Sequence, residues 1–153
     1  MRGIALILLA SLLACTEAGN AQQDAEAAQD PAAALASNLE QAIERGDEAA
    51  FRALVKFDGT NDEVQQVFAR LSGGILGRGV NAVTLEPPSD QTQPYDFNGT
   101  RYELNGDAVG EVKVDFAMDN PNESETFSMA YGLEDGRAVI LLAAPAGPAA
   151  GEE

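Results

Sequence analysis

The chain has 153 residues, enough for one domain with additional targeting and linker segments. Its 25 acidic and 9 basic residues give a formal net charge of −16, which argues against binding to the phosphate backbone of nucleic acids. The sequence contains no histidine and one cysteine, which excludes Ser-His-Asp and Cys-His catalysis, histidine-ligated metals and an internal disulfide. The acidic surface would suit solubility, or a partner that is cationic or uses divalent ions.

The N-terminal residues have the pattern of a secretion signal. Met1 and Arg2 supply positive charge, and residues 4–14 are isoleucine, leucine and alanine, interrupted only by Ser11. Such an apolar run is shorter than the ~20 residues that a membrane-spanning helix requires. We therefore expect residues 1–14 to be a signal peptide.

The apolar run ends in Leu12-Leu13-Ala14-Cys15. This sequence resembles the lipobox of bacterial lipoproteins, in which leucine, a variable position and a small residue precede cysteine. The resemblance implies cleavage before Cys15, acylation of that residue and anchoring in the membrane of the cell envelope. The next residue is Thr16 rather than the aspartate associated with inner-membrane retention, which implies the outer membrane, facing the periplasm. The alternative is an ordinary signal peptide with a cysteine at this position.

Two low-complexity segments flank the predicted folded region. Residues 15–30 have no large apolar side chain, so we expect the lipidated Cys15 to be followed by a disordered tether. Residues 146–153 are expected to form a disordered acidic tail. The predicted domain therefore comprises residues 31–145.

Three amphipathic helices are predicted in the first half of the domain. The first is expected to run from Asp30-Pro31 to Gly46, and the second from Asp47 to Gly59. The third is expected to begin at a capping box, formed by Thr60 with Glu63, and to end at Gly73-Gly74. Their expected buried faces are, in order, Leu35, Leu39, Ala42 and Ile43; Phe51, Leu54 and Val55; and Val64, Val67, Phe68 and Leu71.

The second half of the domain alternates between apolar and polar residues, as strands do. We expect strands at residues 80–85, 101–104 and 138–144, and a hairpin turn at Asn105-Gly106. Two further strands have one apolar face each, formed by Val112, Val114, Phe116 and Met118 in the first and by Phe127, Met129, Tyr131 and Leu133 in the second.

Helices followed by antiparallel strands indicate an α+β fold, with three N-terminal helices packed on a curved antiparallel sheet of four to five strands. The segments LEQAIERGDEAAFRAL, with Gly-Asp between two helices, and GLEDGRAVILLAAP, with Asp-Gly before an apolar last strand, resemble the NTF2-like (cystatin-like cone) superfamily. This resemblance implies a cone with a pocket between sheet and helices. Another helix-on-sheet sandwich is the alternative.

The candidate pocket residues lie on the sheet face expected to point toward the helices. They are Tyr131, Phe127, Met129 and Phe116. Tyr131 could donate a hydrogen bond to a ligand, although a tyrosine in such a position more often belongs to the core. Glu111 and Asp115 are expected on the opposite face, and a register slip of one residue would reverse this. We predict no catalytic residue, metal site or cofactor.

The leading hypothesis is a lipid-anchored cell-envelope protein that is not an enzyme and binds a small apolar ligand or an envelope protein. The first alternative is a cone enzyme that transfers protons between a carboxylate, a tyrosine and a small hydrophobic substrate. The second alternative is an accessory subunit of an envelope complex. A cavity of several hundred cubic ångströms with a buried acid near Tyr131 would favour the enzyme, and a filled core would exclude it.

Overall fold

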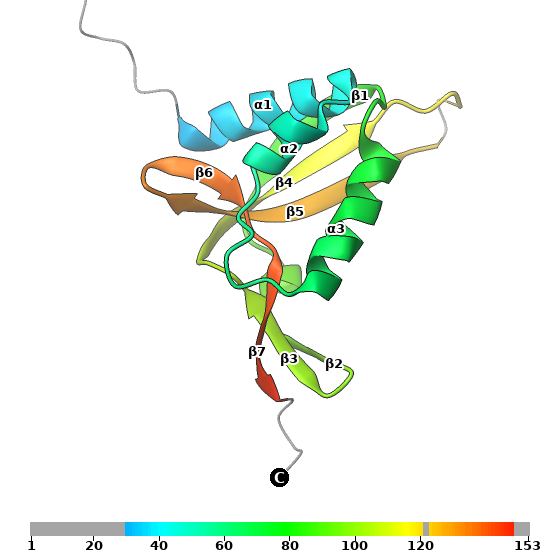
Figure 1. Cartoon of the computed structure of the whole chain (residues 1–153). Coiled ribbons are helices and arrows are strands. Elements are labelled where there is room, and N and C mark those ends of the chain that lie inside the picture. Colours follow the sequence, from blue (N-terminus) through cyan, green and yellow to red (C-terminus); the bar gives the residue numbers. More distant parts are fainter. Residues whose placement is uncertain (1–29, 121–122, 149–153) are drawn as a thin grey trace, which may run out of the picture.

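The computed structural model describes residues 30–120 and 123–148, which form the predicted α+β fold (Figure 1). Three helices come first: α1 (Pro31–Arg45), α2 (Glu48–Ala53) and α3 (Asp62–Ile75). The following elements are β1 (Val80–Glu86), the short 3-10 helix η1 (Asp90–Thr92), β2 (Tyr95–Phe97), β3 (Thr100–Leu104), β4 (Ala108–Phe116), β5 (Glu125–Glu134), β6 (Arg137–Ile140) and β7 (Ala143–Pro148). The predicted signal peptide, Cys15 and nearly all of the tether lie outside the described residues.

The strands form two antiparallel sheets. The larger one has the order β1-β4-β5-β6 and is strongly curled, and the smaller one has the order β2-β3-β7. Helices α1 and α2 cross one face of the larger sheet, α3 descends beside β5, and the smaller sheet lies at the end away from α1 (Figure 1). The expected packing of three helices on a curved antiparallel sheet is therefore confirmed, whereas the second sheet was not predicted. Strand β7 runs past the predicted domain end at Pro145.

Helix α1 has the predicted limits and the predicted buried face. The Asp30 side chain accepts a hydrogen bond from the Ala32 N–H, and Gly46 ends the helix in the left-handed conformation with φ of 64°. All four residues of the predicted face are buried, namely Leu35, Leu39, Ala42 and Ile43. They pack on the inner face of the larger sheet, where Val112, Val114, Phe116 and Ile140 are also buried.

Helix α2 is shorter than predicted, because it ends at Ala53 rather than at Gly59. The chain then runs beside β6, where Val55 forms a parallel bridge with Ile140. The Ile140 N–H donates to the Leu54 carbonyl at 2.8 Å, and the Lys56 N–H donates to the Ile140 carbonyl at 2.9 Å. These long-range bonds take the place of the bonds that a longer helix would make.

Helix α3 differs from the prediction at both ends and in its buried face. Its N-cap is Asn61, which accepts a hydrogen bond from the Val64 N–H at 3.0 Å, and the helix continues through Gly73-Gly74 to Ile75. Phe68, Ser72 and Ile75 are the buried residues. Val67 and Leu71 were expected in the core, yet each is 47% exposed.

The predicted hairpin at Asn105-Gly106 is wrong, because β3 pairs with β2 and β7 whereas β4 pairs with β1 and β5. The hairpin is formed instead by Asn98-Gly99 between β2 and β3, with φ of 50° and 73°. Both values are in the left-handed region, which asparagine and glycine tolerate best.

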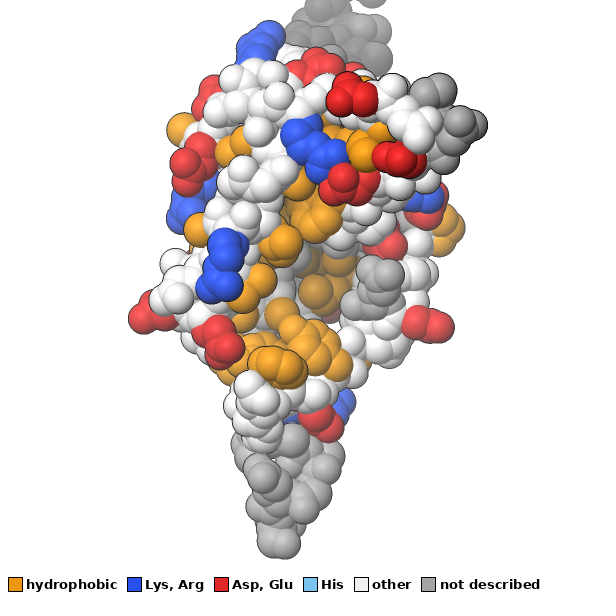
Figure 2. Space-filling model, turned by 90° about the vertical axis from the view of Figure 1, so that its right-hand side faces the viewer, with side chains coloured by type: hydrophobic (Ala, Val, Ile, Leu, Met, Phe, Trp, Pro, Cys, Tyr) orange, Lys and Arg blue, Asp and Glu red, His pale blue; other side chains and the backbone are white. Residues whose placement is uncertain are grey.

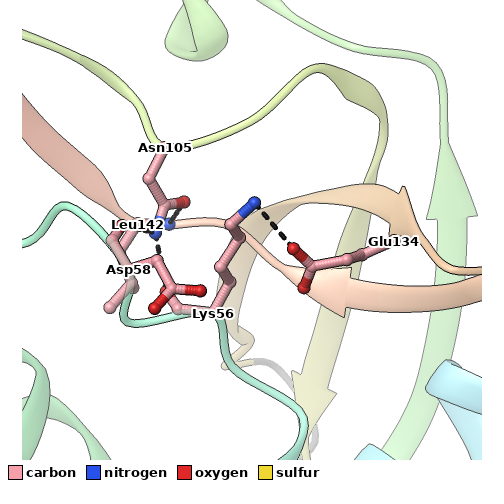
Figure 3. A network of polar contacts seen from close by, with 5 residues as sticks. All are labelled: Lys56, Asp58, Asn105, Glu134 and Leu142. Carbon is pink, nitrogen blue, oxygen red and sulfur yellow. Dashed lines mark hydrogen bonds and ion pairs between the residues drawn. The ribbon is translucent and has the colours of Figure 1, made fainter.

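The Asn105 side chain joins three segments (Figure 3). Its Nδ2 donates to the carbonyl oxygens of Lys56 at 2.7 Å and Asp58 at 3.0 Å, and its Oδ1 accepts from the Leu142 N–H at 3.0 Å. An ion pair of 2.9 Å between Lys56 Nζ and Glu134 lies beside it. The network connects the segment after α2 to two of the chain crossings between the sheets, the one from β3 to β4 and the one from β6 to β7.

The apolar alternation of β4 and β5 is confirmed for the centre of the sheet. Val112 and Val114 of β4 lie opposite Met129 and Phe127 of β5. Leu133 differs from the prediction, because it is 57% exposed near the turn to β6. The predicted strand at residues 138–144 is divided between β6 and β7, because the chain changes sheets after Ile140.

Candidate functional site

A cavity of about 520 Å³ opens between α3, β5 and the smaller sheet. Figure 2 shows the hollow with hydrophobic side chains inside it. Cavities of this size and composition are typical of sites for small molecules. Each of its three walls follows from a different local feature of the chain.

The first wall is an apolar stripe on α3. Phe68 is held toward the interior because its ring stacks on Phe51 at 5.4 Å and meets the Phe57 ring edge-on at 5.3 Å. Val64, Val67 and Leu71 lie three and four residues apart, so they share one side of the helix. All three line the cavity, which accounts for the exposure of Val67 and Leu71.

The second wall is the edge of β5. Only residues 131–134 of β5 pair with β6, while the β4 pairing on the other side covers residues 125–132. Phe127, Ser128, Met129 and Ala130 all line the cavity. Successive side chains of a strand point to opposite faces, so four consecutive residues can line one cavity only along the edge of the strand.

The third wall is aromatic and belongs to the β2–β3 hairpin. Tyr95 and Tyr102 lie opposite each other in the paired strands, and their rings stack with centroids 5.5 Å apart. Partial burial, followed by the charge of Tyr102, raises the pKa of the Tyr95 hydroxyl above its usual value. Phe97, at the tip of the same hairpin, also lines the cavity. The hairpin therefore contributes large, flat apolar surfaces.

Two acidic residues, Glu63 and Glu111, are the only charged residues among the described residues that line the cavity. Glu111 lies opposite Ala130, on the sheet face away from Val112, as predicted. It is nevertheless buried, because Ser89 in the loop after β1 covers it and donates both its N–H and its hydroxyl to Glu111 Oε1.

The four predicted pocket residues are divided between the cavity and the core. Phe127 and Met129 line the cavity, whereas Tyr131 and Phe116 are buried in the core beneath the helices and are not among its lining residues. Sequence reasoning missed Val67, Leu71 and Glu111 as cavity residues. The apolar stripe of α3 was visible in the sequence but was assigned to the core, and Asn98-Gly99 could have indicated the aromatic hairpin.

No family model matches the chain, and neither the curated proteins nor the solved structures include a significant match to it. Within residues 30–120 and 123–148, no group of three or more acidic or cysteine residues is arranged to hold a metal ion. None of the helices in that part of the chain has the length and apolarity needed to cross a membrane.

Proposed function

We propose that the domain is a binding module that holds a small apolar molecule in the cavity between α3, β5 and the β2–β3 hairpin. The observation that carries the proposal is the cavity itself, which has a volume of about 520 Å³ and predominantly apolar walls from three separate elements. Apolar side chains exposed to water cost free energy, and an apolar molecule bound in the cavity would remove these side chains from contact with water.

The enzyme alternative has weaker support. The cavity and the buried Glu111 meet part of the condition stated for a cone enzyme, and helices on a curled sheet are compatible with the NTF2-like resemblance. The tyrosine assigned to proton transfer, Tyr131, packs in the core instead. The geometry therefore supports a binding module best.

Substitution of Leu71 tests the binding proposal. Leu71→Gln should weaken binding of the neutral fluorescent probe N-phenyl-1-naphthylamine by about fivefold, because roughly 1 kcal/mol of apolar contact is lost. The measurement is a fluorescence titration of the full chain. The matched control is Leu133→Gln, which removes a similarly exposed leucine outside the cavity lining and should leave the affinity unchanged. Equal losses in the two variants, or no saturable binding to the unmodified chain, would contradict the proposal.

The location of the module is a separate proposal. The match of Leu12-Leu13-Ala14-Cys15 to the lipobox supports an acyl anchor on Cys15, which would place the domain in the cell envelope, at the outer membrane. Several acyl chains bind a protein to a bilayer far more firmly than one chain does.

Substitution of Cys15 tests the anchor. In bacterial cells, Cys15→Ser should abolish labelling by a radioactive fatty acid and move the protein from the membrane fraction to the soluble fraction. Ser11→Ala, which alters the apolar run but not the lipobox, should leave both unchanged. The anchor proposal is wrong if the Cys15→Ser protein is still labelled by the fatty acid and still sediments with membranes.

A further inference from the structure

Glu111 places in the cavity wall a hydrogen-bond acceptor that has no partner among the described residues. The residue is only 6% exposed, and its Oε1 accepts both bonds from Ser89. Its other oxygen, Oε2, has no hydrogen-bond partner within the described residues. Within the described residues no fully buried side-chain oxygen lacks a partner, so Oε2 is not fully buried. Glu111 lines the cavity, which places its carboxylate within reach of a ligand bound there.

The charge around the cavity limits which ligand is compatible with that oxygen. Among the described lining residues, Glu63 and Glu111 carry the only charges, and both are acidic. The nearest cation along β4, Lys113, does not line the cavity and is paired with Glu86 at 3.5 Å. Interactions between charges strengthen where apolar walls exclude water. A carboxylate or phosphate group would therefore be repelled, whereas a cationic group would be attracted.

We infer that the ligand is an apolar amine, with a hydrocarbon or aromatic body against α3 and the tyrosine rings and one ammonium group that donates to Glu111 Oε2. This inference rests on the proposed function, because it names the class of molecule that the same cavity binds. The ammonium group supplies both the missing hydrogen-bond donor and the opposite charge, and charge-assisted hydrogen bonds are about twice as strong as neutral ones. The ordered Ser89 contact holds Glu111 in position before the ligand arrives.

The test compares three molecules that have the same twelve-carbon body and different head groups. Dodecylamine, dodecanol and dodecanoate are titrated into the full chain below their aggregation concentrations, and displacement of N-phenyl-1-naphthylamine is measured. Dodecylamine should bind at least tenfold more tightly than dodecanol, and dodecanoate should bind most weakly. This ranking uses the unmodified chain, so it decides the question even if a variant fails to fold.

Two variants then locate the preference at Glu111. Glu111→Gln keeps the size of the side chain and an acceptor for Ser89. It should weaken the binding of dodecylamine at least tenfold, while the affinity for dodecanol changes less than threefold. Glu44→Gln removes the same charge from an exposed position on α1 outside the cavity lining, and it should change the affinity for dodecylamine less than twofold.

The possible failures are distinguishable. If dodecanol and dodecanoate displace the probe as well as dodecylamine does, or if Glu111→Gln behaves like Glu44→Gln, the amine inference is overturned while the binding module stands. If the probe binds equally to the unmodified chain and to Leu71→Gln, and none of the three molecules displaces it, the proposed function fails as well.

Discussion

Replacement of Phe51 by alanine is expected to lower the free energy of unfolding by about 3–5 kcal/mol. Phe51 is 1% exposed, and its ring lies nearly parallel to that of Phe68, with 9° between the planes. The substitution would leave a void between α2 and α3 and remove an aromatic contact worth about 1 kcal/mol beyond its buried area. The close-packed interior cannot refill such a void completely.

This substitution should also affect the cavity. Phe68 belongs both to the core and to the cavity lining, so the Phe51 ring helps to hold the α3 wall in place. The measurement is urea unfolding followed by far-ultraviolet circular dichroism, with probe binding determined below the transition. Phe97→Ala is the stability control, because Phe97 is 52% exposed and its loss should change stability by less than about 1 kcal/mol. Similar losses of stability in the two variants would contradict the role given to Phe51.

Asn105→Ala is expected to lower the free energy of unfolding by about 2–3 kcal/mol, from three hydrogen bonds worth about 1 kcal/mol each. The bonds connect the segment after α2 with the chain beyond β6, so their loss should loosen the junction of the two sheets (Figure 3). A neighbouring backbone bond, from the Asn105 N–H to the Leu142 carbonyl at 2.9 Å, remains in the variant.

Asn81→Ala is the matched control for this effect. The Asn81 side chain donates one hydrogen bond of 3.2 Å to the Phe116 carbonyl, so its removal should cost about 1 kcal/mol or less. Both variants are compared by the same urea titration. The bridging role of Asn105 would be wrong if the two substitutions destabilised the protein equally. Asn105→Asp should not restore full stability, because it sets a second oxygen against the carbonyl oxygens of Lys56 and Asp58.

The elements that could be predicted are those whose signals are local. Asp30, Pro31 and Gly46 limit α1 through contacts within a few residues, and the alternation in β4 follows from the geometry of a strand. Asn105-Gly106 shows the limit of such signals. The dipeptide is typical of a tight hairpin, yet here its asparagine binds backbone groups 37 to 49 positions away in the sequence.

The candidate site shows the same limit. Phe127 and Met129 could be assigned to a pocket because they alternate on one face of a strand. Tyr131 continues that alternation, but it lies where β6 completes the sheet and the helices cover it, so it belongs to the core. Glu111 could not be found from periodicity, because its burial depends on Ser89 in a different part of the chain.

The sequence by itself determined the acidic character, the lipobox match, the limits of α1 and the α+β order of helices and strands. These properties depend on composition and on neighbours within a few residues. Only the tertiary structure decided which strands pair, why the α3 stripe lines a cavity rather than the core, and how the carboxylate of Glu111 comes to lie in an apolar wall. These features arise because strand pairing and side-chain burial bring together residues that are far apart in the sequence, and local patterns do not encode that proximity.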